Sequence, residues 1–225
     1  MNKQEKLNNN LINAIYDENL KAMTKYILKG ADVNCTYNYD SPIIKSIKLN
    51  NIDAVRLLIE SGADVNKTSS VLFHPPIIYA IEQENIEIMK LLIDAGANLY
   101  FERLDNKNIL EYAVYNFLKS NNHNFDVIKT LIEANLNINQ KFFNSKSTLL
   151  IKMAEYDNQD YLSYLIDKGA LLNEKNKDGN SALMIASLYN HIKNIRLLLK
   201  NGAMINEQNN GGDTALHLAL NEYNN

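Results

Sequence analysis

The apolar residues of this chain recur every three or four positions in short stretches, and most stretches lead into nearly the same polar turn. Residues 52–59 and 192–199 are clear examples, and their spacing predicts short amphipathic helices. Six turns follow such stretches: Gly30–Asn34, Gly62–Asn66, Gly96–Leu99, Asn135–Asn139, Gly169–Asn173 and Gly202–Asn206. Successive turns lie 32 to 39 residues apart. A period of this length indicates an architecture of stacked repeats.

A second signature lies 21 residues before most of these turns and marks the start of another expected helix. Its copies cover residues 9–15, 41–47, 75–81, 108–114, 148–154, 181–187 and 214–220. Ser41, Ser181 and Thr214 are expected N-caps, whose side-chain oxygens accept hydrogen bonds from amides of the first turn. Pro42 and Pro76 then fall at the first helical position, where the missing N–H costs nothing.

A glycine follows nearly every second helix. Glycine adopts the left-handed backbone conformation that closes a helix C-terminus, because it has no Cβ to clash. Asn135 stands at this position once, and asparagine tolerates the conformation best after glycine. Each unit is therefore expected to be a helix–turn–helix followed by an extended loop, with strand limited to short hairpin pairings.

The two signatures resemble the ankyrin repeat, whose first helix opens Thr-Pro-Leu-His-x-Ala and whose second ends Leu-Leu-x-x-Gly-Ala-Asp-Val-Asn. The resemblance runs from about Asn9 to Leu220. It implies an all-α ankyrin-repeat solenoid with β-hairpin-like loops, forming a single domain over residues 1–225 with about six full repeats and a C-terminal half-repeat. The expected units are residues 5–36, 37–70, 71–103, 104–143, 144–176, 177–209 and, in part, 210–225.

Three departures from the repeat pattern stand out. The histidine of the family motif survives only at His217, so we expect apolar packing to replace its hydrogen bonds. The fourth unit is about seven residues longer, with the excess around residues 117–124 between its helices. This insertion is expected to be a tolerated surface loop or part of a binding face. The last unit opens at 214–220, and there we expect a capping helix, a fragment of a longer array or a contact with a partner.

Composition narrows the class of partner. The formal net charge is −3 and the lysines are scattered among acidic residues, which argues against nucleic acid. No apolar run approaches the ~20 residues needed to cross a bilayer, and the polar start lacks a secretory signal. The single cysteine, Cys35, excludes an intrachain disulfide and fits a reducing compartment. We expect a cytoplasmic, intracellular protein, open to delivery into a host cell, that binds neither nucleic acid nor a membrane.

No catalytic signature stands out in the sequence. It has no glycine-rich phosphate loop, no Gly-x-Ser-x-Gly and no His-Glu-x-x-His. The four histidines fall in four different units without metal-ligand spacing to Cys35. We therefore predict a protein that is not an enzyme and needs no cofactor or metal.

The resemblance implies that partners bind along the concave face made by the first helices and the loop tips. Tyrosine is common in such contacts because it offers a large area at low entropic cost. Tyr79 and Tyr112 sit earlier on the same helices and are expected to be half-buried packing residues. The expected contact residues, taken by position, are Tyr16, Tyr37, Tyr39, Lys48, Leu49, Phe73, His74, Tyr115, Tyr156 and Tyr189.

The leading hypothesis is a non-catalytic protein–protein interaction module that binds an unidentified protein through this face. An alternative is the recognition arm of a larger polypeptide, an enzyme or host-directed effector, that continues beyond Asn225. A third is a self-assembling protein joined through the C-terminal half-repeat, although we expect a monomer.

Overall fold

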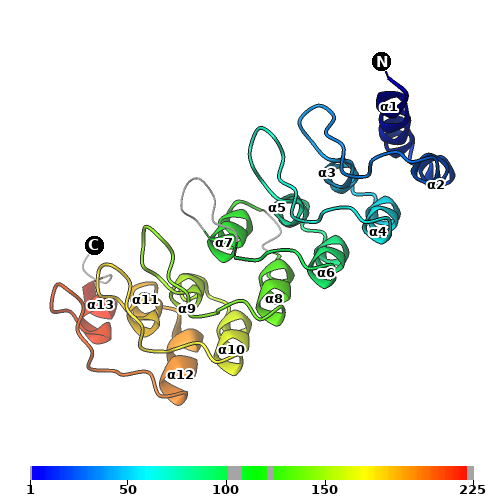
Figure 1. Cartoon of the computed structure of the whole chain (residues 1–225). Helices are drawn as coiled ribbons and strands as arrows, with labels where there is room; N and C mark the ends of the chain where they lie inside the picture. The colour runs from blue at the N-terminus through cyan, green and yellow to red at the C-terminus, as the bar shows by residue number, and fades with distance from the viewer. Residues whose placement is uncertain (1, 101–107, 121–123, 222–225) are drawn as a thin grey trace. The chain divides into compact units, whose positions relative to one another are not determined.

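The computed structural model describes residues 2–100, 108–120 and 124–221, and within them every regular element is an α-helix (Figure 1). The helices are α1 (Lys3–Tyr16), α2 (Leu20–Leu28), α3 (Pro42–Lys48), α4 (Ile52–Glu60), α5 (Pro76–Glu82), α6 (Ile86–Asp94), α7 (Ile109–Lys119), α8 (Asp126–Glu133), α9 (Leu149–Met153), α10 (Gln159–Asp167), α11 (Ala182–Leu188), α12 (Ile192–Lys200) and α13 (Ala215–Asn221). The prediction of an all-α solenoid of helix–turn–helix units is confirmed.

The chain divides into two compact units, residues 1–135 (unit 1, α1–α8) and residues 136–225 (unit 2, α9–α13). In each unit, the first helices of successive pairs pack side by side in one layer and the second helices in another. In the described part of the chain, each expected repeat interval contains one helix pair, and the last interval contains α13. The grouping of all repeats into a single domain stays a prediction.

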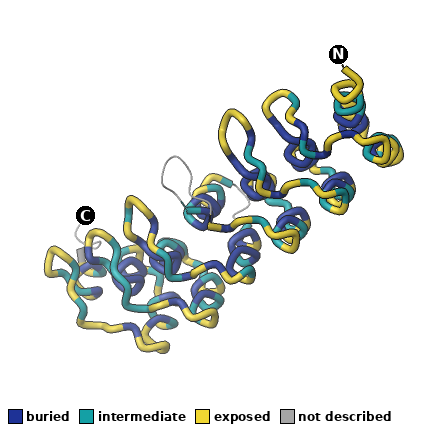
Figure 2. The backbone as a smooth tube through the Cα atoms, in the orientation of Figure 1, coloured by how far each residue is buried: buried dark blue, intermediate teal, exposed yellow. Residues whose placement is uncertain are grey.

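In each unit the buried residues come from both helix layers, and Figure 2 draws these segments in dark blue. Apolar side chains occupy most of the positions where the family motif has histidine, and each of these is no more than 1% exposed. They are Ile12, Ile44, Ile78, Ile151 and Met184. Their burial supports the expectation that apolar packing replaces the hydrogen bonds of the missing histidines.

The recurring turns close the second helices as expected. Gly62 has φ +87° and Asn135 has φ 62°, so both adopt the left-handed conformation. At the next position along the turn, Ala63 N–H donates to the carbonyl oxygen of Leu58 over 2.9 Å. This bond satisfies a carbonyl that the helix end leaves unpaired.

Asparagines at the ends of the turns link neighbouring repeats. Asn34 Nδ2 donates to the carbonyl oxygen of Gly62 over 3.1 Å, and its Oδ1 accepts from the amide of Asp64 over 2.7 Å. Asn66 makes the same pair of bonds to the following turn in unit 1, and Asn139 repeats it in unit 2. The amide side chain both donates and accepts, which is why asparagine suits this position.

Two predicted N-caps are confirmed and one is wrong in detail. The hydroxyl of Ser181 accepts from the amide of Met184, and that of Thr214 accepts from the amide of His217, each over 3.4 Å. Ser41 does occupy the N-cap position of α3, but its hydroxyl accepts no bond from the helix and has no hydrogen-bond partner. Pro42 pre-sets the first helical φ, so α3 begins without this cap.

Two helices are longer than the signatures indicate. α1 begins at Lys3, six residues before the signature at Asn9, because Asn2 and Glu5 form a reciprocal capping box there. α7 runs to Lys119, so residues 117–119 of the predicted loop insertion are helical, and residues 121–123 lie outside the described part. Phe117 is buried against Phe125, with ring centroids 6.2 Å apart, and this packing extends the helix.

Candidate partner-binding face

The loop between α2 and α3 reverses through a tight turn at its tip. Tyr37 N–H donates to the carbonyl oxygen of Asp40 over 2.9 Å, and Asp40 N–H donates back over 3.2 Å. The two intervening residues, Asn38 and Tyr39, have φ values of 46° and 71°. Positive φ at both central positions is typical of the tight turns that close hairpins. A single bridge therefore forms the hairpin-like element expected here.

Tyr39 lies three residues before the start of α3. The same position occurs three residues before later first helices, and it has positive φ in every repeat where the structure describes it. The residues at this position are Tyr39, Phe73, Lys146, Gly179 and Gly212. A residue with a Cβ pays roughly 1–2 kcal/mol in this conformation, whereas glycine adopts it freely. Two bulky aromatic residues thus stand where the backbone favours glycine.

These two aromatic side chains point into solvent. Tyr39 is 65% exposed and Phe73 is 53% exposed, and Val71 and Leu72 beside Phe73 are exposed as well. The loops before α3 and α5 project as largely exposed tips (Figure 2). Tyr39 and Phe73 are both among the expected contact residues, and their contact role stays a prediction. An exposed apolar cluster of this kind is typical of an interaction site.

The residue that follows each of these aromatics turns inward. Asp40 and His74 are buried, so the prediction that His74 lies exposed on the loop is wrong. The imidazole packs between neighbouring helices, with its ring centroid 6.0 Å from that of Tyr79 and 6.2 Å from that of Tyr112. His74 therefore supports the face from beneath and does not form its surface.

Asp40 holds two lysines of α3 beneath and along this face. Lys48 Nζ donates to Asp40 Oδ2 over 2.8 Å, and Lys45 Nζ lies 3.8 Å from the same oxygen. The two lysines are three positions apart and therefore share one side of the helix. Because Lys45 is buried, its ammonium group needs this counter-charge.

Tyrosine rings surround the two ammonium groups. Lys45 Nζ lies 5.6 Å from the ring centroids of both Tyr16 and Tyr37. Lys48 Nζ lies 4.4 Å from the ring centroid of Tyr79. A cation over an aromatic face is attracted by the ring quadrupole, so these contacts fix the lysines and the rings together. The result is a continuous cluster from α1 across α3 to α5.

The cluster continues to α7. Tyr79 donates its hydroxyl proton to Ser69 Oγ over 2.9 Å, and Tyr112 donates to the carboxylate of Glu82. Tyr112 also stacks on Tyr115 with ring centroids 6.5 Å apart. Lys119 Nζ lies 4.4 Å from the ring centroid of Tyr115 and ends the series. Tyr79 and Tyr112 are buried, more deeply than the half-buried packing expected of them.

The structure brings most of the predicted contact residues together, but not all. We use the name aromatic–lysine face for the accessible set in unit 1, which consists of Tyr16, Tyr37, Tyr39, Lys48, Leu49, Phe73 and Tyr115. All are exposed except Tyr37, which is half-buried. Tyr156 and Tyr189 belong to unit 2 and are not part of this cluster. The sequence analysis did not include Lys45 and Lys119 among the contact residues. Lys45 precedes Lys48 by three positions and Lys119 follows Tyr115 by four, and this helical spacing could have indicated both.

In unit 2 the two predicted tyrosines have separate surroundings. Tyr189 is exposed and stacks on His191, with ring centroids 5.8 Å apart. Tyr156 is half-buried, and its carbonyl oxygen accepts a hydrogen bond from Asn194 over 2.6 Å. Burial, followed by the charge of Glu155, raises the pKa of the Tyr156 phenol above its usual value. Both residues stay predictions as contact residues.

Cys35, the single cysteine of the chain, is buried. Burial, followed by the nearby charge of Asp32, raises the pKa of the Cys35 thiol and so disfavours the reactive thiolate. Across residues 2–100, 108–120 and 124–221, no three His, Cys, Asp or Glu side chains converge in a way that could hold a metal ion. In the same ranges, no helix has the length and apolar character required to span a bilayer.

Several solved structures share this fold. The chain is similar to the ankyrin repeat domain of Bcl-3, of the IkappaB protein family, with 23% identity, 93% of each chain covered and a TM-score of 0.77. It is similar to the ankyrin repeat domain of human ASB11, with 23% identity, coverage of 93% of this chain and 90% of that one, and a TM-score of 0.68. A chain of the complex between the predatory endopeptidase Bd0816 of Bdellovibrio bacteriovorus and the immunity protein Bd3460 gives 24% identity, 83% and 94% coverage and a TM-score of 0.66.

Comparison at the sequence level points the same way. No curated protein matches the chain. The family model for ankyrin repeats in three copies matches residues 117–209 and 173–225, and the model for ankyrin repeats in many copies matches residues 43–93. These matches lie on the helix pairs described above, with their glycine turns and linking asparagines. The chain is a member of the ankyrin repeat family.

Proposed function

We propose that this protein is a non-catalytic interaction module that binds a partner protein through the aromatic–lysine face of unit 1. The observation that carries the proposal is the placement of Tyr39 and Phe73 at loop positions where the backbone favours glycine. Both side chains are exposed and gain little from packing within the chain, so contact with a partner accounts for aromatic residues there. The fold is one that other ankyrin repeat proteins use for protein interaction, which supports the proposal.

The face also has the physical character of a binding surface. Its exposed tyrosines present a large, amphipathic area, while the Asp40–Lys45 pair and the buried rings hold it in one arrangement. Rings fixed before binding lose little conformational entropy when a partner docks. Lys48 in the face and Lys119 beside its Tyr115 ring supply positive charge that favours a partner with acidic residues around an apolar centre.

A double substitution to glycine tests this proposal more sharply than alanine would. In the Tyr39→Gly/Phe73→Gly variant both loops keep their positive-φ backbone and the strain of a Cβ is removed. We expect the free energy of unfolding to change by no more than about 1 kcal/mol, because relief of strain offsets the greater entropy of the unfolded chain. We expect affinity for the partner to fall by at least about tenfold, as for loss of hot-spot side chains.

The measurement is affinity capture from native lysate with the full chain as bait, followed by titration with the captured protein. Phe143→Ser is the matched control, since Phe143 is an exposed aromatic residue on a loop of unit 2. This control should bind as the wild type does. Undiminished binding by the double glycine variant would show that the loop tips do not form the binding surface.

A further inference from the structure

The loop before α5 ends in a tip that backbone hydrogen bonds close at its base. Phe73 N–H donates to the carbonyl oxygen of Ser69 over 3.1 Å, and Ser69 N–H donates to that of His74 over 3.0 Å. The Ser69 hydroxyl also accepts the phenolic proton of Tyr79, which ties the base of the tip to α5. Residues 70–73 therefore project from a fixed base.

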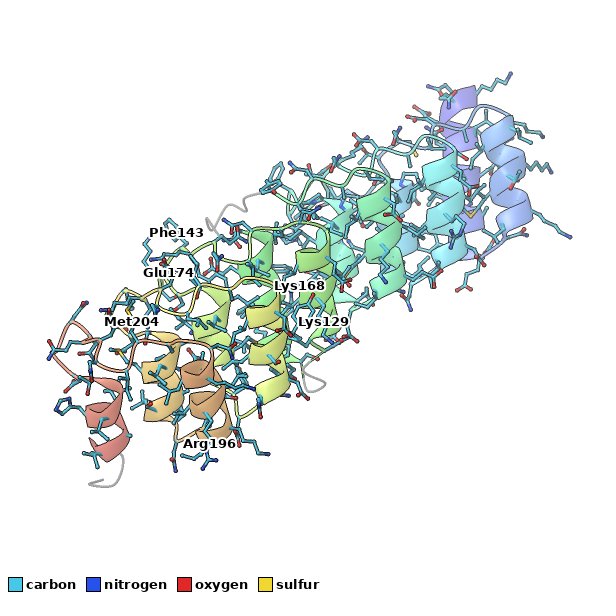
Figure 3. All side chains as sticks on the ribbon, turned by 90° about the horizontal axis from the view of Figure 1, so that it is seen from below. Lys129, Phe143, Lys168, Glu174, Arg196 and Met204 are labelled. Carbon is cyan, nitrogen blue, oxygen red and sulfur yellow. The ribbon has the colours of Figure 1, made fainter. Side chains whose placement is uncertain are left out.

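The same closed tip occurs in unit 2, before α9. Lys146 N–H donates to the carbonyl oxygen of Phe142, and Phe142 N–H donates to that of Ser147, each over 2.9 Å. Phe73 and Lys146 occupy the same place in the two tips, and both have φ 52°. Figure 3 shows one residue of the unit 2 tip, Phe143, at the edge of that unit. The unit 2 tip consists of Phe143, Asn144, Ser145 and Lys146, and the unit 1 tip consists of Ser70, Val71, Leu72 and Phe73.

Three consecutive apolar side chains of the unit 1 tip are exposed, and we name them the apolar tip. Val71 is 57% exposed, Leu72 is 52% exposed and Phe73 is 53% exposed. Apolar area left in water costs solvation free energy, and the polar residues of the unit 2 tip show that the backbone geometry does not require it. Apolar residues gathered at such a place are typical of a contact with another protein.

The loop that follows a tip does not cover these positions. Beside the unit 2 tip, Lys177 N–H of the next loop donates to the carbonyl oxygen of Ser145 over 2.9 Å, and yet Asn144 and Lys146 are exposed. In unit 1, Tyr39 is 65% exposed although its carbonyl oxygen accepts a bond from the loop before α5. Exposure at the first and last positions of the apolar tip therefore does not depend on the loop that follows.

We propose that the apolar tip is a plug that enters an apolar pocket of the partner protein. The proposal rests on the function proposed above and names the kind of partner that the face fits. The tip projects beyond the first helices (Figure 1). A pocket can therefore bury all three side chains at once, whereas a flat surface would cover only one side of them.

Charge specifies the pocket further. The apolar tip carries no charged side chain, whereas the matching positions in unit 2 include Lys146. We therefore expect the centre of the pocket to be uncharged. Lys48 lies in the same face, on α3, so acidic residues of the partner belong at the rim of the pocket.

Exchange of the two tips gives matched variants. In the tip-exchange variant, Val71→Asn/Leu72→Ser/Phe73→Lys, unit 1 receives the residues of the unit 2 tip. The reciprocal variant is Asn144→Val/Ser145→Leu/Lys146→Phe. Each sequence already forms this backbone geometry in the chain, so both variants should fold, and circular dichroism during heating checks this.

The probe for insertion into a pocket is β-cyclodextrin, a cyclic sugar with an apolar cavity. It is titrated into the full chain, and the amide chemical shifts are followed by nuclear magnetic resonance. We expect shift changes at residues 70–74 in the wild type, their loss in the tip-exchange variant, and stronger binding at residues 143–147 in the reciprocal variant. Absence of changes at residues 70–74 in the wild type, or their persistence after tip exchange, would overturn the proposal.

The partner protein captured by the full chain provides a second test. A cyclic peptide of residues 69–74 should displace this protein from the chain, and a cyclic peptide of residues 142–147 should not. Tip exchange should weaken its binding by at least about tenfold, as for loss of hot-spot side chains.

Two further results separate this proposal from the proposed function. If Tyr39→Gly weakens partner binding but tip exchange does not, the plug is wrong and the proposed function stands. If neither change weakens binding, the proposed function is wrong as well. Self-association of the full chain that tip exchange abolishes, measured by sedimentation, would also overturn the proposal, because a second copy would then be the occupant.

Discussion

Asp40 is the residue on which the order of the aromatic–lysine face most depends. It is buried, it accepts a hydrogen bond from Lys48, and it is the counter-charge closest to the buried ammonium group of Lys45. A buried charge that loses its partner is strongly unfavourable, because neither water nor another charge compensates it. Asp40 therefore stabilises the fold mainly through its pair with the buried Lys45, and less through its pair with the more accessible Lys48.

We expect Asp40→Ala to lower the free energy of unfolding by about 2–4 kcal/mol, since Lys45 would be left buried and uncompensated. Lys48→Ala is the comparison, because the Lys48 side chain is 41% exposed and its pair is screened by solvent. That substitution should cost less than about 1 kcal/mol. Urea unfolding of both variants checks the order. Equal losses would mean that Asp40 does not compensate Lys45.

Local chemistry explains which residues could be placed from the sequence. Gly62 and Asn135 were predicted correctly because a helix end demands positive φ there whatever surrounds it. His74 was not, because its direction is set by rings on α5 and α7 that are distant along the chain. Tyr39 lies between these cases. Its exposure follows from the repeat pattern, but its left-handed backbone is indicated only indirectly, by Gly179 and Gly212 at the corresponding positions of later repeats.

Among elements, α7 shows how an insertion can be absorbed into a helix. The fourth unit is longer than the others around residues 117–124, and this extra length predicts a surface loop. The helix is extended by the contact between Phe117 of α7 and Phe125 at the start of α8. This contact joins two different helices, so the local sequence pattern of α7 does not predict it. A side chain buried to this extent gives the longer helix a packing role.

A pair of substitutions in α7 tests this role. Phe117→Ala should lower the free energy of unfolding by about 3 kcal/mol, the cost of removing a buried aromatic side chain and leaving a cavity. Leu118→Ala, at the adjacent exposed position, should cost less than about 0.5 kcal/mol. Chemical denaturation gives both values. If both variants lost only a small and similar free energy of unfolding, residues 117–119 would be a tolerated surface segment without a packing role.

At the scale of the whole molecule, the same pair of asparagine hydrogen bonds recurs at several of the steps between neighbouring repeats. Asn34, Asn66 and Asn139 carry identical hydrogen bonds to the following turns. In a stack of this kind, stability is close to a sum of the repeats and their nearest-neighbour interfaces, and at least three repeats are needed. The two compact units differ in this respect: among the residues that the structure describes, unit 1 has four helix pairs and unit 2 has two pairs and α13.

We therefore expect the separately expressed segment 1–135 to fold alone and to unfold in one cooperative transition. The segment 136–225 should be less stable, with a midpoint lower by several degrees or more, because fewer interfaces offset the entropy of its chain. Circular dichroism during heating measures both. Since every residue of the aromatic–lysine face lies in unit 1, segment 1–135 should also retain the partner captured by the full chain. A stable 136–225 beside an unfolded 1–135 would show that the number of helix pairs does not set the order of stability.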